Sequence, residues 1–336
     1  MGRPSPDASP IGGHWTRRRS FLAGATLGLG ALGAAVYRGR SGPVAKARGV
    51  PMFVARGQDY GGPLETTVRD GLIAVGLGPA SVRGLRVLLK PNLVEPSRAA
   101  PHMTTHPSLV VAVTHVLRGW GAAVAVGEGP GHMRDTEMAL DESGLGDALA
   151  DAGVEFVDLN HDEPAWSRNV FGASRLDGFH VARSVLAADL VVSMPKLKTH
   201  HWVGMTASMK NLYGVLPGMM YGWPKNVLHH AGIPETVVDI LAALPRTVAV
   251  VDAIDCMEGD GPIMGDLKKL GVVVVGTNPP AVDATCARIM GLDPARVSYL
   301  RKASGRLGPI AETLIDQRGE RWSAVASPFR IPEIRI

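Results

Sequence analysis

Residues 190–214 read LVVSMPKLKTHHWVGMTASMKNLYG, and the rest of the chain can be interpreted outward from this stretch. Its first five residues form an apolar run that predicts a buried β-strand, and residues 206–216 predict a helix. A cluster of basic residues, which includes Lys196, Lys198 and His200, lies between the two. Ligands bind at the carboxyl ends of strands in open α/β sheets, so this position predicts a binding cleft.

The region 190–234 contains four lysines and four histidines but no Asp or Glu. Positive charge gathered at a buried sheet edge needs a negative partner, so the region predicts an anionic ligand. Lys196 and Lys198 alternate, so they share one face of an extended strand and suit a phosphate or carboxylate. Lys210 and Asn211 lie in the predicted helix, whose first turn would add backbone N–H donors. The alternative is a solvated basic loop.

Short apolar runs alternate with helical patterns along the chain. The predicted strands cover residues 85–89, 122–126, 154–159, 190–194, 248–253 and 272–276. The predicted helices cover residues 64–75, 108–120, 145–152, 206–216, 234–244 and 281–290. This alternation predicts an α/β fold with a mostly parallel, twisted sheet and helices on both faces, in a Rossmann-like three-layer arrangement.

The chain divides into four predicted parts: an export signal (1–47), an N-terminal extension (48–80), an α/β core (81–303) and a C-terminal helix with an edge segment (304–336). Residues 216–234 predict a long loop or lid. The first 47 residues carry seven Lys/Arg and one Asp, which accounts for the formal charge of +4, and the remainder holds 28 basic and 30 acidic residues. The overall charge therefore gives no argument for a nucleic-acid partner.

A moderately apolar run rich in Gly, Ala and Leu extends from Phe21 to Val36, and it begins within the segment Arg18-Arg19-Ser20-Phe21-Leu22. The pattern resembles a twin-arginine export signal with cleavage after residue 47. It predicts interaction with the twin-arginine translocase and a periplasmic or other extracytoplasmic location. An uncleaved leader would anchor the protein in a membrane, and a plain basic tail is the third alternative.

Cys256 and Cys286 are the two cysteines of the chain, and no CxxC motif occurs. Four thiolates for an iron–sulfur cluster cannot come from one such chain. Export would permit a disulfide, but two buried thiols are the preferred interpretation.

Polar side chains follow most of the predicted strands. Lys90-Pro91-Asn92 follows the first strand, and Glu128 follows the second within a glycine-rich segment. The residues expected to bind the ligand are Lys90, Asn92, Glu128, Lys196, Lys198 and Asn211. The catalytic candidates are His200, Lys210 and Glu258.

The fifth predicted strand leads into a glycine-containing acidic loop. Asp255, Glu258 and Asp260 carry the oxygen ligands that divalent cations prefer, so they are the candidate metal ligands. Two alternatives are an acidic loop without a ligand and a counter-charge to the lysines across the cleft. A copper site built from the histidines and methionines is conceivable, but methionines at helical spacing indicate core packing.

Several short segments occur in a particular order along the chain. They are Lys90-Pro91-Asn92, Gly127-Glu128, PKLKTH at 195–200, SMKNLYG at 208–214, EGDGP at 258–262 and GTNPPAVD at 276–283. Together they resemble domain-of-unknown-function family 362 over about residues 85–300. The motif positions that the resemblance implies as functional are Lys90, Glu128, Lys196, Lys198, His200, Lys210, Asn211, Glu258, Asp260 and Asp283. Many members carry ferredoxin-type cysteine motifs, and this chain lacks them. For this chain the resemblance therefore implies a separate redox partner protein and no iron–sulfur cluster of its own.

The sequence therefore predicts an exported α/β protein whose cleft binds a small anionic molecule, and an enzyme is favoured. Lys90, Lys196 and Lys198 would hold the anion, and His200 would act as acid or base because its charge can change near neutral pH. Glu258 would serve a metal or act as a base. The alternatives are a non-catalytic anion- or metal-binding protein and a redox accessory protein associated with an iron–sulfur partner.

Overall fold

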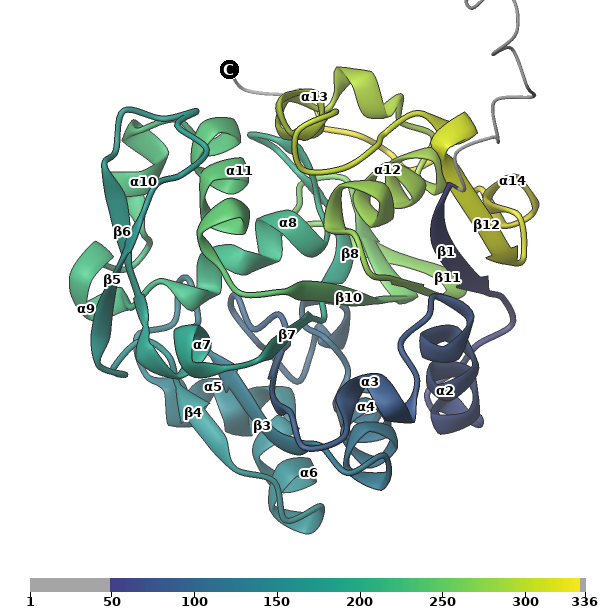
Figure 1. The fold of residues 1–336 in the computed structure, drawn as a ribbon, viewed down its shortest axis with the longest axis horizontal. Helices are drawn as coiled ribbons and strands as arrows, with labels where there is room; N and C mark the ends of the chain where they lie inside the picture. The colour runs from purple at the N-terminus through teal and green to yellow at the C-terminus, as the bar shows by residue number, and fades with distance from the viewer. Residues whose placement is uncertain (1–48, 333–336) are drawn as a thin grey trace, which may run out of the picture. The chain divides into compact units, whose positions relative to one another are not determined.

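A mixed sheet of ten strands crosses the protein in this computed structural model, which describes residues 49–332 (Figure 1). The predicted export signal and residues 333–336 lie outside the described residues. The strand order is β12 (Ile315–Gly319), β1 (Val50–Ala55), β11 (Asp266–Gly276), β10 (Thr247–Glu258), β7 (Leu190–Ser193), β2 (Arg86–Lys90), β3 (Ala123–Glu128) and β4 (Phe156–Asp158). Two further strands complete the sheet: β8 (Lys196–His200) pairs with β10, and β9 (Gly204–Thr206) pairs with β8.

The half of the sheet that carries the candidate residues is parallel. Strands β10, β7, β2, β3 and β4 pair in parallel, as the sequence predicts. Strand β11 is antiparallel to both β10 and β1, which corrects the expectation of a simple βαβ succession there. The reason is the short connection after β10, because a tight turn returns the chain antiparallel whereas a parallel strand needs a long crossover.

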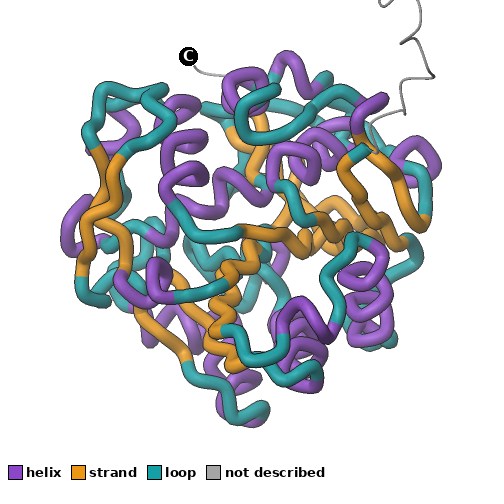
Figure 2. Tube along the Cα trace, viewed as in Figure 1, coloured by secondary structure: helices purple, strands orange, loops and turns teal. Residues whose placement is uncertain are grey.

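Helices cover both faces of the sheet (Figure 1, Figure 2). Helices α8 (Ser208–Asn211), α11 (Ile233–Ala243), α12 (Pro279–Ile289) and α13 (Ser298–Ala303) lie over one face. Helices α2 (Leu64–Ala74), α4 (Pro107–Gly119) and α6 (Leu145–Asp151) lie over the other. Val191 and Val192 are neighbours on β7 and belong to two different apolar clusters, one on each face. The near-continuous apolar strands follow from burial on both sides, and the predicted three-layer α/β fold is confirmed.

The remaining elements are short. They are α3 (Pro79–Val82), α5 (Thr136–Ser143), α7 (Arg183–Ala187), α9 (Gly218–Tyr221), α10 (Asn226–His230), α14 (Trp322–Val325), a separate hairpin of β5 (Pro164–Arg168) and β6 (Gly178–Ala182), and 3-10 turns at Pro101–Met103, Leu212–Val215, Pro294–Arg296 and Glu312–Leu314. None of the described helices has the length and apolar character that spanning a membrane requires.

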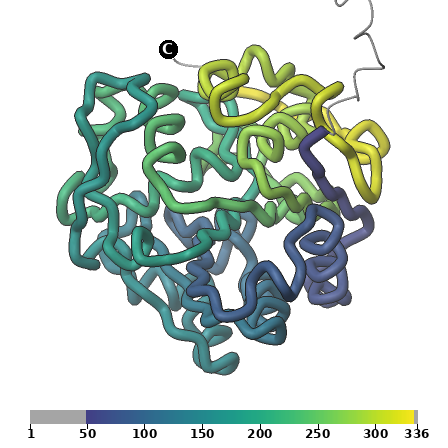
Figure 3. Tube along the Cα trace, viewed as in Figure 1, coloured from purple at the N-terminus to yellow at the C-terminus, as the bar shows by residue number. Residues whose placement is uncertain are grey.

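Four segments differ from their prediction. The helix predicted at 206–216 is the one-turn helix α8 followed by the 3-10 turn Leu212–Val215. The predicted loop at 216–234 contains α9 and α10. In the C-terminal part, a helix up to residue 315 and an edge strand at 329–336 are expected, but residues 304–311 form no helix and residues 329–332 form no strand. The edge strand is β12, whose sequence IDQRG is too polar to be recognised as a strand. Residues 48–80 contain the helix predicted at 64–75, which is α2, and also the unpredicted strand β1, which lies beside the C-terminal β12 (Figure 3).

Candidate functional site

A cavity of about 830 Å³ lies at the carboxyl ends of β2 and β3 and beside β8. We call it the lysine–histidine cavity. Its basic lining residues are Lys90, His132, His200, His201, Lys210, Lys225 and His229. Parallel strands end at one edge of the sheet, so Lys90 and Glu128 meet although 38 residues separate them. The cleft predicted at this edge is present.

Lys90 and Glu128 form a buried ion pair in the wall of this cavity. The Lys90 ammonium also donates to the Pro91 carbonyl oxygen at 2.7 Å and to Asn211 Oδ1 at 3.0 Å. Asn211 Nδ2 in turn donates to the Lys90 carbonyl oxygen and to Ser193 Oγ. All three ammonium protons of Lys90 are thus engaged within the protein. Lys90, Glu128 and Asn211 all line the cavity, as predicted, but the Lys90 ammonium has no proton left for a ligand.

Burial opposes the charged form of both partners in this pair. It lowers the pKa of Lys90 and raises the pKa of Glu128, while the contact between the two groups acts in the opposite direction in each case. Gly214 makes the arrangement sterically feasible, because a Cβ atom there would collide with the Glu128 carboxylate and lie 2.6 Å from Lys90 Cε. The lack of space for a side chain explains why the SMKNLYG segment ends in glycine.

Of the three lysines that line the cavity, Lys210 and Lys225 have hydrogen-bonding capacity left for a ligand. Among the described contacts, the Lys210 ammonium has no hydrogen bond or ion pair, and it lies 3.9 Å from the centroid of the Tyr213 ring. The Lys225 ammonium donates to the carbonyl oxygens of Gly129 and Tyr213 at 3.2 and 3.3 Å, which leaves one proton free. Burial, followed by the charge of Lys90, lowers the pKa of Lys210 to about 7.

Lys225 and Lys198, which are both buried, share this unusual acidity. Burial lowers the pKa of Lys225 to about 7, with a smaller opposing contribution from Glu128. Burial and then the charges of Lys196 and Lys210 lower the pKa of Lys198 to about 7. Lys198 is outside the cavity lining, and its ammonium donates to the Met103 carbonyl oxygen at 2.8 Å. The positive charge of these groups is thus easily lost near neutral pH.

Burial favours the neutral form of His200 and His229 in the cavity. Burial, followed by the charge of Lys210, lowers the pKa of His200 well below its usual value and that of His229 to about 4. His200 Nδ1 accepts the backbone N–H of Trp202 at 3.2 Å. The proton of neutral His200 is therefore assigned to Nε2, which makes that atom a hydrogen-bond donor.

Asn92 also lines the cavity, as the sequence predicts for a binding residue. Its side chain is 5% exposed, and its Oδ1 atom is buried without a hydrogen-bond partner. Buried polar atoms in proteins are almost always paired, so this amide has an unfilled requirement beside the cavity.

Lys196 lies outside the cavity lining, contrary to the expectation that it faces the ligand with Lys90. Its ammonium pairs with the Asp252 carboxylate, and neither side chain is exposed. Asp252 is therefore the counter-charge for one lysine of the cationic stretch.

The first two backbone N–H groups of the short helix α8 are already engaged within the protein, contrary to the expectation that they are free for an anion. The N–H groups of Ser208 and Met209 and the Ser208 hydroxyl all donate to the Asp283 carboxylate. Burial raises the pKa of Asp283 to about 6, and these hydrogen bonds oppose the shift. The Asp283 carboxylate thus accepts the hydrogen bonds that were predicted for an anionic ligand.

The three candidate metal ligands are not gathered into one cluster. Glu258 bonds to Arg330 and lies 3.6 Å from Lys268, whereas Asp260 lines the cavity. Asp255 is opposite Lys269 in the pairing of β10 with β11. Across residues 49–332, no group of three or more His, Cys, Asp or Glu side chains is arranged to hold a metal ion. Glu258 is likewise absent from the cavity lining, so its predicted catalytic role finds no geometric support.

Several cavity residues were not among the predicted site residues. They are His132, His201, Trp202, Tyr213, Lys225 and His229. Lys225 and His229 lie in the segment predicted as a lid, and their basic character was the available signal. The sequence does not indicate that Trp202 and Tyr213 line a cavity, because aromatic residues in such positions also pack into hydrophobic cores.

Comparison with known proteins agrees with these motif positions. Residues 87–288 match the family described as "Domain of unknown function (DUF362)". A relative is the "Thylakoid-associated protein" of Synechocystis sp., which is 29% identical over 288 residues and covers 83% of this chain and 87% of the relative. The matched segment contains β2, β3, β7 and the lysine–histidine cavity residues from Lys90 to Asp260. This chain belongs to the DUF362 family.

Proposed function

We propose that the lysine–histidine cavity binds a small anion that carries a carboxylate or phosphate, and that the protein is an enzyme acting on it. The observation that carries the proposal is the Lys210 ammonium, which lines the cavity and has no acceptor among the described contacts. Lys225 contributes one further free N–H, and Asn92 has an unfilled hydrogen-bond requirement. An anionic oxygen would accept hydrogen bonds from both lysines, and a hydroxyl or other donor on the same ligand would satisfy the Asn92 Oδ1 atom, which is an acceptor.

The lysine acidity supports the same ligand charge. Lys198, Lys210 and Lys225 have pKa values of about 7, which is low because burial and mutual repulsion disfavour their charged forms. A bound anion would reverse this effect and raise these pKa values. The protein should therefore take up protons when it binds an anion at pH 7 to 8.

Proton transfer is the chemistry that these residues favour. A lysine with a pKa of about 7 is present in both protonation states at neutral pH, so Lys210 can act as acid or base. Neutral His200 can donate from Nε2 to an oxygen on which negative charge develops. We therefore assign the catalytic roles to Lys210 and His200.

Isothermal titration with inorganic phosphate and with acetate tests the binding step. Lys210→Met should abolish the heat of binding, whereas Lys269→Met, which removes an exposed lysine on β11, should leave the heat unchanged. Repeating the wild-type titration in buffers of different ionisation enthalpy should reveal proton uptake. Equal affinity of the two variants would refute the assignment of Lys210.

We also propose that the protein works outside the cytoplasm. The Arg18-Arg19 pair and the apolar run after it support export, and the thylakoid-associated relative supports a location at or across a membrane. Replacing both arginines by lysine should retain the chain in the cytoplasm in a cell-fractionation experiment. Unchanged fractionation would argue against the twin-arginine route.

A further inference from the structure

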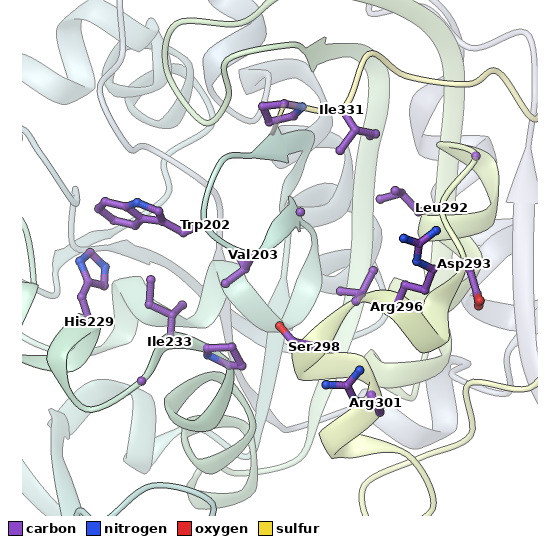
Figure 4. A pocket seen from close by; sticks show the side chains of 16 residues that line it. Trp202, Val203, His229, Ile233, Leu292, Asp293, Arg296, Ser298, Arg301 and Ile331 are labelled. Carbon is purple, nitrogen blue, oxygen red and sulfur yellow. The ribbon is translucent and has the colours of Figure 1, made fainter. Parts of the chain in front are cut away.

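A second hollow adjoins the lysine–histidine cavity. Its volume is about 1110 Å³, and we call it the apolar groove. Trp202, His229 and Pro332 line both the groove and the cavity. Figure 4 shows Trp202 and His229 at one end of the groove, Arg296 and Asp293 toward the other, and Val203 and Ile233 between them.

The groove has a different chemical character from the cavity. Part of its lining is aliphatic, with Val203 3%, Val297 4% and Ile233 9% exposed, and Asp293, Arg296 and Arg301 add charged groups. Leu292 and Ile331 extend the same apolar lining. The lining therefore suits a hydrocarbon chain, whereas the cavity beside it suits an anion.

A series of neighbouring side chains connects the cavity with the groove. The Lys210 ammonium lies 3.9 Å from the Tyr213 ring centroid, the Tyr213 and His229 centroids are 6.1 Å apart, and those of His229 and Trp202 are 4.8 Å apart. A single ligand with a medium-length alkyl chain can span these steps. Trp202 is 41% exposed, so its indole forms an accessible apolar rim between the two hollows.

We infer that the ligand is an amphipathic anion whose charged end binds at Lys210 and whose hydrocarbon chain crosses Trp202 into the apolar groove. This inference rests on the proposed function and adds the class of substrate. The inference depends on the continuity of the two hollows, because a small polar anion would fill only the cavity and make no contact with the groove. Each methylene group that enters the groove should tighten binding about two- to fourfold.

Titration with a homologous series of probes tests the inference. The probes are butanoate, octanoate and dodecanoate, with the matching alkyl phosphates, all below their micelle concentrations. Affinity should rise along each series, and Lys210→Met should weaken every member. Dodecyltrimethylammonium, which has the same chain with a cationic head, should bind at least tenfold more weakly than dodecanoate.

Two groove variants separate the chain from the head. Leu292→Glu places a charge in the groove, and Ser298→Trp fills part of it. Each should weaken dodecanoate at least tenfold and leave butanoate unchanged. Leu314→Glu introduces the same charge at a leucine that is 48% exposed and outside the groove, and it should have no effect. Using two unlike variants protects the test against a folding defect in one of them, which a thermal melt would reveal.

The outcomes distinguish this inference from the proposed function. If butanoate and inorganic phosphate bind through Lys210 but affinity does not change with chain length, the amphipathic ligand is refuted and the anion site stands. If the cationic probe binds as well as dodecanoate, the coupling of head and chain is refuted. If neither the short anions nor dodecanoate bind to the wild-type protein, both proposals fail.

Discussion

The ammonium of Lys196 lies 2.7 Å from the carboxylate of Asp252, and both side chains are fully buried. The two residues are register partners on the parallel strands β8 and β10. Tyr60 completes the cluster, because its hydroxyl donates to Asp252 and accepts from Lys196. Lys196 and Lys210 belong to one cationic stretch of sequence, yet Lys196 is paired within the fold and Lys210 faces a cavity.

Lys196→Met should therefore destabilise the protein by about 3–5 kcal/mol, because it leaves the Asp252 carboxylate buried without its partner. Urea denaturation followed by circular dichroism measures this change. The double variant Lys196→Met/Asp252→Leu should recover much of the loss, since it removes both charges. A loss below about 1 kcal/mol in the single variant would mean that the pair behaves as an exposed one.

The free energy of unfolding should rise with pH between about 7 and 9. Lys198, Lys210 and Lys225 have pKa values of about 7 in the folded protein, compared with an ordinary value of 10.5. In this window the unfolded chain binds more protons than the folded one, so raising the pH favours folding.

Lys225→Met should reduce the slope of stability against pH, because it removes one of the groups that titrate differently in the two states. Urea denaturation across the window measures the slope, and Lys269→Met is the control with an unchanged slope. Identical slopes in the wild-type and Lys225→Met proteins would contradict the depressed lysine pKa.

Gly214→Ala should destabilise the protein by about 1–3 kcal/mol, since the new methyl group would displace the buried Lys90–Glu128 pair. Gly131 offers a matched control, because it lines the same cavity and a Cβ atom there would meet nothing within 4 Å. Thermal melts of the two alanine variants should therefore differ. If both melt at the wild-type temperature, the cavity wall is looser than described.

Asp283→Ala should cost about 3 kcal/mol or more, because it leaves the buried donors of Ser208, Met209 and Tyr299 without an acceptor. Asp283→Asn keeps one acceptor oxygen and should cost less. Asp147→Ala, at an exposed position of α6, is the control for the loss of a carboxylate. Chemical denaturation would reveal the order of the three variants, and equal stability of Asp283→Ala and Asp147→Ala would contradict the role of Asp283.

Cys256 and Cys286 should be unreactive toward a thiol reagent in the native protein. Both are buried and free, and burial raises the pKa of each thiol. Two equivalents should react once the protein is unfolded in guanidinium chloride without a reductant. Reaction of fewer than two would indicate a disulfide in the purified protein, contrary to the structure.

Much of the fold follows from local sequence pattern. The strands β2, β3 and β7 were predicted within two residues, because buried strands of a layered α/β fold are apolar on both faces. Only the buried, apolar halves of β10 and β11 were predicted, and their more polar halves at 254–258 and 266–271 were not. The edge strand β12 was missed, since a strand with an open edge and partly exposed faces does not need an apolar sequence. The direction of β11 was also missed, because a run of valines fits parallel and antiparallel pairing equally well.

The site was predicted by position and only partly by residue. Lys90, Glu128, His200, Lys210 and Asn211 do meet at the cavity, since the ends of parallel strands lie at one edge of a sheet. Their separate roles could not be read from the sequence. The sequence gives no way to tell the roles of Lys90 and Lys210 apart, because both are lysines. Lys90 is engaged by Glu128 and Asn211, which are distant in sequence, whereas Lys210 has no such partner.

The sequence alone determined that positive charge would collect at the carboxyl edge of a layered α/β sheet, because strand periodicity and the order of residues after each strand are local properties. Only the tertiary structure decided which charges were free, since compensation by Asp252 and Glu128 depends on contacts over 56 and 38 residues. The apolar groove likewise arises where α11, α13 and the turn at Trp202 come together, and no local pattern encodes such a junction.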